Sequence, residues 1–241
     1  MHQILKIASA VAGLALAFPA PLARADAHPA VPSAPAPVVV ADSGDSASAA
    51  SRALELNTVR AGLRPLVLEL ALQAHARATA AGETTSSLLT VIDYSLLSRE
   101  RRFWVLDLDS GEVLARELVA HGNGTGGDAA RHFSNRPGSY QSSLGTFVTG
   151  PTYQGKHGLS LRLRGLDAGL NDKAEARAIV VHGARYVNDG IVNQLGRLGR
   201  SQGCPALSEA AAPRIIELIR GGTVVFSYFP DPSLESTLAA S

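Results

Sequence analysis

The chain contains one cysteine, Cys204, in the stretch GRSQGCPAL at residues 199–207. A cysteine thiolate is a strong nucleophile, and Gly203 leaves the approach to the sulfur atom open. The alternative is a structural thiol, because free cysteines are among the most frequently buried residues and behave as small apolar side chains. The neighbouring residues favour the nucleophile.

A histidine that can serve as the base lies 22 residues before Cys204. In AIVVHGARYV, residues 178–187, a β-branched run places His182 at the end of an expected strand, and Gly183 begins a loop. A histidine at a strand end can point into a cleft and take the proton of a thiol. Cys204 and His182 together predict a Cys/His acyl-transfer site.

The turn before Cys204 is expected to stabilise negative charge. A helix is expected over residues 208–220, and N–H groups near a helix start favour a thiolate. Arg200 adds a positive charge nearby. We expect backbone amides of this turn, with Gly203 and Ser201 in support, to hold the oxyanion of a tetrahedral intermediate.

Short extended runs must position these residues. The stretch RRFWVLDLDSGEVLARELVAHG predicts a β-hairpin with its turn at Asp109, Ser110 and Gly111. No regular alternation of strands and helices is visible, so the pattern predicts a mainly β fold of the α+β class. The expected strands are 103–108, 113–120, 145–149, 159–163, 178–182 and 223–229, and the helix over 208–220 is expected to end at Gly221-Gly222.

The N-terminal residues predict export. Lys6, an apolar run over residues 7–18 and small residues up to Ala27 form the layout of a cleavable signal peptide, which places the protein in the periplasm or cell envelope. The following stretch is rich in Ala, Pro, Ser and Val, which is typical of disorder. The expected divisions are a signal peptide at 1–27, a disordered linker at 28–53, a helical segment at 54–82, a catalytic domain at 83–230 and a C-terminal tail at 231–241.

Composition argues against several classes of function. With 22 Lys+Arg and 21 Asp+Glu the formal net charge is +1, so no broad basic surface is expected to attract nucleic acid. The N-terminal apolar run is shorter than the roughly 20 residues of a membrane span, so no stable span is expected. The chain lacks HExxH and CxxC spacings, and we expect neither a metal ion nor a cofactor.

The motifs around His182 and Cys204 resemble those of a known family. VVHGARYV followed by GRSQGCPAL resembles the HG...SxGC signature of the murein L,D-transpeptidases, in a sub-group with a Cys-Pro-Ala form. The likeness covers roughly residues 91–228. It continues in VIDYSLLSRERRFWVLDLDSGEVLARELVAHGNGTGG, FSNRPGSYQSSLGTFVTGPTYQGKHGLSLRLRGLDAGLND and GGTVVFSYF, each in the family's order.

This resemblance implies a β-sandwich-like catalytic domain that acts on the peptide stems of peptidoglycan. Cys204 matches the family's nucleophile, which attacks the carbonyl before the terminal D-residue of a tetrapeptide stem and forms a thioester. An amine of a neighbouring stem then takes the acyl group. His182 matches the acid and base, and Gly183 matches the residue whose carbonyl group steers the imidazole.

One position departs from the broader superfamily. An arginine usually stands two residues beyond the cysteine, where this chain has Ala206. Arg200 or Arg197 is expected to supply the missing charge for a stem carboxylate, and His157 is expected to line the same cleft unless it is a solvated loop residue.

Two other functions remain open at this stage. The same site with water as the acceptor would be an L,D-carboxypeptidase, because the difference lies in what the cleft admits. A wall-binding domain that has lost turnover would keep the fold and have an unreactive thiol. The acyl acceptor and the oligomeric state stay undetermined by the sequence.

Overall fold

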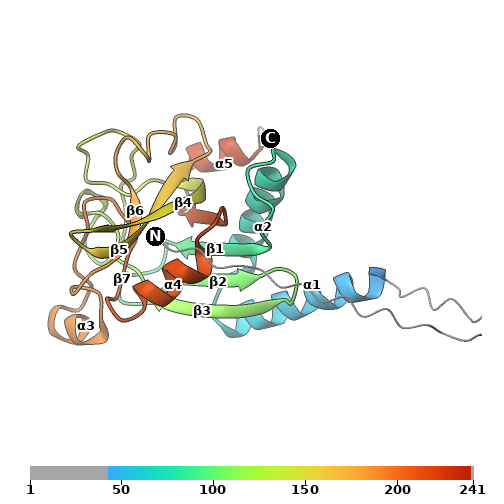
Figure 1. Cartoon of the computed structure of the whole chain (residues 1–241). Coiled ribbons are helices and arrows are strands. Elements are labelled where there is room, and N and C mark those ends of the chain that lie inside the picture. Colours follow the sequence, from blue (N-terminus) through green and yellow to red (C-terminus); the bar gives the residue numbers. More distant parts are fainter. Residues whose placement is uncertain (1–42, 240–241) are drawn as a thin grey trace, which may run out of the picture. The chain divides into compact units, whose positions relative to one another are not determined.

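The computed structural model describes residues 43–239 (Figure 1). The expected signal peptide at 1–27 and most of the expected linker at 28–53 lie outside the described residues. The described part forms a mainly β structure with helices near both ends, so the predicted α+β class is confirmed.

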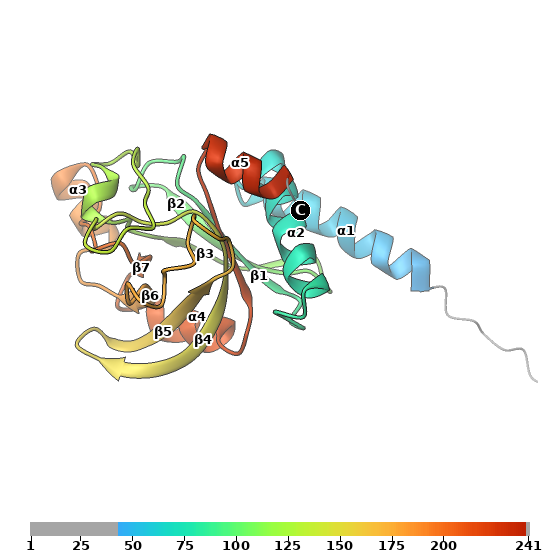
Figure 2. The ribbon, with the colours of Figure 1, turned by 90° about the horizontal axis from the view of Figure 1, so that it is seen from above.

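Eight strands form one sheet in the order β3-β2-β1-β8-β4-β5-β6-β7. Adjacent strands are antiparallel except for the pairs β1–β8 and β6–β7. Figure 2 shows that β4 and β5 are strongly curved, which gives the sheet its sandwich-like form. The strands are β1 Leu88–Asp93, β2 Arg101–Asp107, β3 Glu112–Leu118, β4 Gly145–Gly155, β5 Gly158–Gly165, β6 Val180–Gly183, β7 Ala206–Leu207 and β8 Val224–Tyr228.

Every strand expected from the sequence is present, with ends that differ by a few residues, and the predicted β2–β3 hairpin is confirmed. At its turn Gly111 has a φ of 72°, which glycine adopts without strain. Strand β1 was not expected, although it lies between β2 and β8 near the middle of the sheet. Five of its six residues are buried, so the run lacks the alternation that marks a half-exposed strand.

The β4–β5 hairpin is longer than predicted. Strand β4 was expected to end at Thr149 but continues to Gly155, and its register with β5 shifts between Thr149 and Thr152. Such an irregularity bends a strand and increases its twist. The hairpin consequently extends beyond β8 and carries His157 at its tip.

Helix α1 spans Ser43–Arg60 and helix α2 spans Pro65–Ala80. The expected linker was therefore too long, because the chain is already helical ten residues before Leu54. Ala-rich sequence favours helix, and the β2–β3 turn packs against this helix: a Cβ placed on Gly111 would lie 2.4 Å from the carbonyl oxygen of Ala50. Pro65 occupies the first turn of α2, where its missing N–H has no cost.

Three further helices follow in the second half of the described chain: α3 Asp189–Leu195, α4 Ala212–Ile219 and α5 Pro232–Ala239. Helix α3 was not expected; Asn188 caps it by accepting the N–H of Ile191. Helix α5 lies in residues expected as a tail, where Leu234 is fully buried and the helix contacts α2 (Figure 1). No helix among residues 43–239 is long and apolar enough to span a membrane.

The main core joins the sheet to α2 and α4. Ile215, Ile216 and Ile219 of α4 are fully buried in it, as are Val67 and Ala71 of α2. Each large aliphatic side chain of this kind contributes about 1.5–3 kcal/mol by leaving water. A second cluster holds the segments near β6 and β7 together and consists of Leu118, Ala120, Ala184, Val187, Leu198 and Ala206.

Candidate active site

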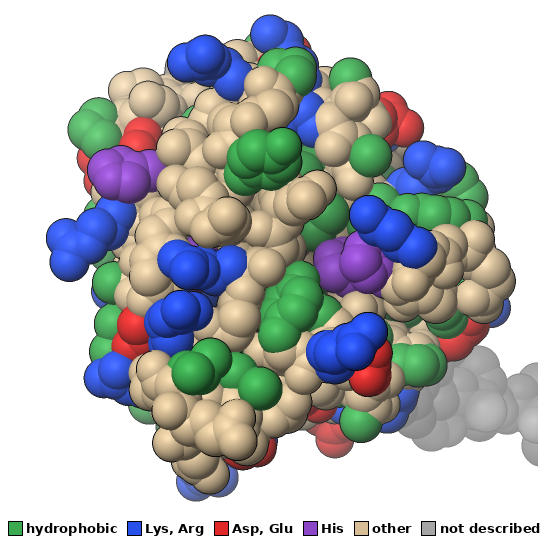
Figure 3. Space-filling model, turned by 90° about the vertical axis from the view of Figure 1, so that its left-hand side faces the viewer, with side chains coloured by type: hydrophobic (Ala, Val, Ile, Leu, Met, Phe, Trp, Pro, Cys, Tyr) green, Lys and Arg blue, Asp and Glu red, His purple; other side chains and the backbone are tan. Residues whose placement is uncertain are grey.

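A cavity of about 570 Å³ lies where the β4–β5 hairpin, β6 and the loop before β7 meet. The face of the molecule that carries these loops is shown in Figure 3, where several Lys and Arg side chains lie near the histidine side chains. Cys204 and His182 both line this cavity, so the structure brings the two predicted residues to one place. Its other polar lining includes Tyr153, Lys156, His157, Arg177, Tyr186, Arg200, Ser201 and Gln202.

Strand β6 positions His182. Within this strand, His182 pairs with Ser160 of β5 on one side and with Ala206 of β7 on the other. Ala206 is two residues beyond Cys204. The Nδ1 atom of His182 lies 2.9 Å from the carbonyl oxygen of Gly183. A carbonyl only accepts, so Nδ1 carries the proton and Nε2 of the neutral ring is free to act as a base.

Burial lowers the pKa of His182 below its ordinary value. The Gly183 carbonyl opposes this shift, whereas His157 and Lys156 add to it by charge repulsion. The ring of His157 stacks on that of His182, with centroids 4.3 Å apart and planes inclined by 25°. His182 is therefore neutral at pH 7, as a general base must be.

Removing the His157 ring is expected to raise the pKa of His182. His157→Ala both admits water to His182 and removes a repulsive charge, and the two effects have the same sign. The pKa of His182 is therefore expected to rise toward its ordinary value, so the acid limb of the activity profile moves to higher pH. His157→Phe keeps a stacked ring and is expected to raise the pKa of His182 less. NMR titration of His182 measures both variants, and equal shifts would contradict this account.

The loop before β7 positions Cys204. The hydroxyl of Ser201 donates to the carbonyl oxygen of Cys204 over 2.6 Å and accepts the N–H of Gly203 over 3.1 Å. Ser201 therefore supports the turn as expected, but the amide of Gly203 is engaged within it and is not turned to an oxyanion. Gly203 has a φ of 119°, and a Cβ there would lie 2.9 Å from the carbonyl oxygen of Gln141.

The expected helix does not begin at the cysteine. Pro205 is followed by β7, in which Ala206 and Leu207 pair with β6, and α4 starts only at Ala212. The hydroxyl of Ser208 accepts the N–H of Ala211 and shapes the intervening turn. The dipole of α4 therefore does not act directly on the sulfur atom, and the argument from a helix start was wrong.

Burial raises the pKa of the Cys204 thiol above its ordinary value. Hydrogen bonding to the amide of Val180, the charge of Arg177 and the amide of Cys204 itself oppose the rise. The pKa values of Cys204 and His182 thus shift in opposite directions, and both shifts favour the neutral form. At pH 7 the resting site holds a thiol and a neutral imidazole.

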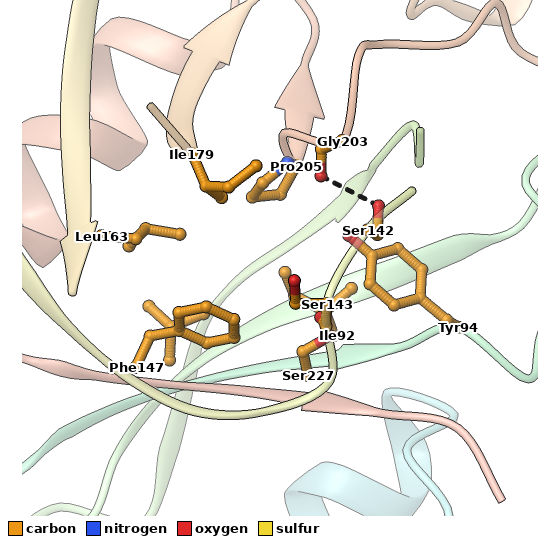
Figure 4. Close-up of a pocket in the computed structure, with 11 residues that line it drawn as sticks. Ile92, Tyr94, Ser142, Ser143, Phe147, Leu163, Ile179, Gly203, Pro205 and Ser227 are labelled. Carbon is orange, nitrogen blue, oxygen red and sulfur yellow. Dashed lines mark hydrogen bonds between the residues drawn. The ribbon is translucent and has the colours of Figure 1, made fainter. Parts of the chain in front are cut away.

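The residues beneath the cysteine loop form a buried network (Figure 4). The hydroxyl of Ser142 donates to the carbonyl oxygen of Gly203 over 3.0 Å and accepts the N–H of Gly122 over 3.0 Å. The N–H of Asn123 donates to the carbonyl oxygen of Ser201. Segment 120–126 consequently supports the loop that carries Cys204.

Gly122 is the residue at which segment 120–126 packs closely against the backbone of the cysteine loop. A Cβ there would lie 2.3 Å from the carbonyl oxygen of Tyr140 and 2.9 Å from Cα of Gly203, both of which are backbone atoms. Gly122→Ala is expected to destabilise the fold by about 2 kcal/mol and to misplace Cys204. Gly127→Ala is the matched control, because a Cβ at Gly127 meets nothing within 4 Å. Thermal unfolding measures both, and equal losses would refute the argument.

Two of the expected substrate contacts line the cavity and one does not. Arg200 lines it and donates to the carbonyl oxygen of Gly126 over 2.9 Å. His157 lines it above His182. Arg197 instead donates to the carbonyl oxygen of Leu198 and is not among the lining residues.

Arg177 is a cavity residue that no sequence pattern singled out. It lies just before β6, and its guanidinium group donates to four oxygen atoms, those of Ser134, Ser139, Gln141 and Ser143. Only the fold brings residues 134–143 to it, so no local signal could have revealed this contact. Among the described residues no group of three His, Cys, Asp or Glu is placed to hold a metal ion.

Comparisons with known proteins identify the family. The sequence profile described as the L,D-transpeptidase catalytic domain matches residues 60–228. No match is found among the curated proteins.

Among solved structures, the chain is similar to an L,D-transpeptidase from Mycobacterium smegmatis, with 17% identity, a TM-score of 0.37 and coverage of 60% of this chain and 59% of that one. An L,D-transpeptidase from Xylanimonas cellulosilytica gives 20% identity, a TM-score of 0.35 and coverage of 64% and 68%. The helical cell shape determining protein Pgp2 from Campylobacter jejuni gives 12% identity, a TM-score of 0.39, and coverage of 66% of this chain and 57% of that one. The chain thus spans about three fifths of the length of the Mycobacterium smegmatis protein.

The profile covers more than half of the chain and includes both motifs from which the resemblance was drawn. The chain belongs to the L,D-transpeptidase catalytic domain family.

Proposed function

We propose that this protein is a cysteine L,D-transpeptidase that acts on the peptide stems of peptidoglycan. The observation that carries the proposal is the placement of Cys204 and His182 on one cavity, with Nε2 of His182 left as a proton acceptor. A nucleophile beside an oriented base is the arrangement that acyl transfer requires.

The reaction has two halves. Nε2 of His182 takes the proton of the Cys204 thiol as the sulfur attacks the carbonyl carbon before the terminal residue of a tetrapeptide stem. The C–N bond breaks, the departing amine receives that proton, and a thioester remains. An acceptor amine then attacks the thioester and gives its proton to His182, and the thiol is restored. The amide of Cys204 is the candidate oxyanion donor.

The charge of the cavity supports a substrate with free carboxylates. Lys156, Arg177 and Arg200 line it, and no Asp or Glu is among the lining residues. Stem peptides carry carboxylates, and a field of one sign in a concave site concentrates ligands of the opposite sign.

Arg200 is the proposed contact for a stem carboxylate, because it is partly buried in the cavity wall and held at Gly126. Arg200→Ala is expected to raise KM for the donor stem about tenfold with little change in kcat, as expected for loss of one charge-assisted hydrogen bond. Steady-state kinetics with stem fragments measures this, and an unchanged KM would exclude Arg200 as the contact.

Mass spectrometry of the purified protein with tetrapeptide-stem fragments tests the function, with Cys204→Ala as the inactive reference. Cross-linked dimers and released terminal residue in wild type alone would support the transpeptidase. Tripeptide products without dimers would favour the carboxypeptidase. Fragments that stay bound without any product would favour a wall-binding domain.

The proposed reaction takes place outside the cytoplasm. The signal-peptide pattern at residues 1–27 supports export to the periplasm or cell envelope. Cell fractionation tests this location, with Lys6 and the apolar run deleted as the control.

A further inference from the structure

We infer that Arg177 is a positioning residue for the nucleophile, and that its cation is the charge partner of the Cys204 thiolate. The inference rests on the proposed role of Cys204 as the nucleophile. The guanidinium group of Arg177 is half-buried, and its hydrogen bonds go to neutral oxygen atoms.

The four acceptors of Arg177 are two carbonyl groups and two hydroxyl groups. None of the ion pairs in the described part of the chain includes Arg177. A half-buried cation is costly unless an anion or several hydrogen bonds compensate it. The hydrogen bonds fix the guanidinium group in place, and they leave its charge without a counter-ion.

The segment that follows Arg177 surrounds the sulfur atom. The carbonyl oxygen of Ala178 lies 3.7 Å from Sγ of Cys204, and the amide of Val180 hydrogen-bonds to the sulfur. Ala178 has a φ of 53°, a conformation that costs a residue with a side chain about 1 kcal/mol or more. The chain therefore reverses direction at the residue whose carbonyl oxygen lies next to the sulfur.

Arg177 also approaches the cysteine loop directly. A Cβ placed on Gly203 would lie 3.4 Å from Nη2 of Arg177, so the guanidinium group packs against the residue before the nucleophile. Both Arg177 and Cys204 line the cavity. The group proposed to form a negative charge during the reaction thus lies near a fixed cation that makes no ion pair within residues 43–239.

The other charged and titratable groups near the sulfur atom lack the combination of positive charge and four hydrogen bonds that Arg177 has. Lys156 is exposed on the β4–β5 hairpin, and Arg200 is held by a hydrogen bond to the carbonyl oxygen of Gly126. Tyr94 and Tyr186 carry no positive charge, and burial raises the pKa of each to about 12. Arg177 is the cation among them that is held by four hydrogen bonds.

Alkylation of Cys204 by iodoacetamide tests the inference in the full-length protein. The rate is measured against pH by intact-mass spectrometry, so the thiol pKa is obtained without any peptidoglycan substrate. Arg177→Gln is expected to raise this pKa by about one unit and to slow alkylation at pH 7.5 about tenfold. Arg177→Lys keeps the charge and is expected to retain most of the wild-type rate.

Arg200→Gln is the matched control, because it removes one positive charge from the same cavity and is expected to shift the thiol pKa much less. A wild-type thiol pKa in folded Arg177→Gln would overturn the inference. Should that variant fail to fold, a tenfold slowing of alkylation at pH 7.5 in Arg177→Lys would overturn the inference, and a near-wild-type profile of rate against pH would support it. The alkylation assay does not measure turnover of stem peptides. A failure of the proposed function is therefore recognised separately from a failure of this inference.

Discussion

His182→Asn is expected to reduce the rate of thioester formation by about three orders of magnitude. Its amide nitrogen can replace Nδ1 and donate to the carbonyl oxygen of Gly183, which His182 contacts at 2.9 Å. The variant therefore keeps the local hydrogen bond and loses only the proton acceptor at Nε2. Rapid-quench mass spectrometry of the acyl-enzyme measures the rate, with Cys204→Ala as the zero reference.

The reactivity of the thiol itself serves as the control. Alkylation of Cys204 at pH 9 and above depends on the thiolate and needs no base, so His182→Asn should approach wild type there. A variant that acylates at the wild-type rate would show that another group takes the proton. A variant that neither acylates nor alkylates would indicate that the loop of Cys204 is displaced. Its loss of acylation would then not support His182 as the proton acceptor.

Acid is expected to destabilise the fold through His121. Burial, with the charge of Arg102, lowers the pKa of His121 from 6.5 to about 4. Arg102 can only donate, so Nδ1 of His121 accepts its hydrogen bond over 2.7 Å and the ring must stay neutral. Arg102 is itself buried, which lowers its pKa to about 10 and leaves it charged at pH 7.

The direction follows from proton linkage. Between pH 6.5 and pH 4 the unfolded chain binds a proton at His121 and the native protein does not, so the free energy of unfolding falls as the pH falls. From the shift of His121, about 3 kcal/mol is lost between pH 7 and pH 4. The lowered pKa of His182 acts in the same direction.

His121→Asn isolates this effect. Its side-chain oxygen can still accept from Arg102, but it does not titrate, so its urea-unfolding free energy should fall by about 3 kcal/mol less than that of wild type between pH 7 and pH 4. All other titrating groups are common to both proteins and cancel in the difference. Parallel pH dependences in the two proteins would refute the assignment to His121.

Several elements were predictable because their signals are local. The two extended runs on either side of the Asp109–Gly111 turn predicted the β2–β3 hairpin, and the β-branched run before His182 predicted β6. The HG and SQGC motifs likewise pointed to His182 and Cys204. The helix after Cys204 was placed four residues too early, because the Ser208 hydroxyl forms a turn with Ala211 and a proline stands in the first turn of α4.

The sequence by itself predicted Cys204 as the nucleophile, His182 as the base, and the family that the sequence profile then confirmed, since each prediction depends on residue types at short spacing. Only the tertiary structure decided which groups tune them. The stack of His157 on His182 needs the bend of the β4–β5 hairpin, and the bonds of Arg177 need residues 134–143 beside it. Such contacts join segments far apart in the chain, and their energies depend on burial and distance, which local sequence does not encode.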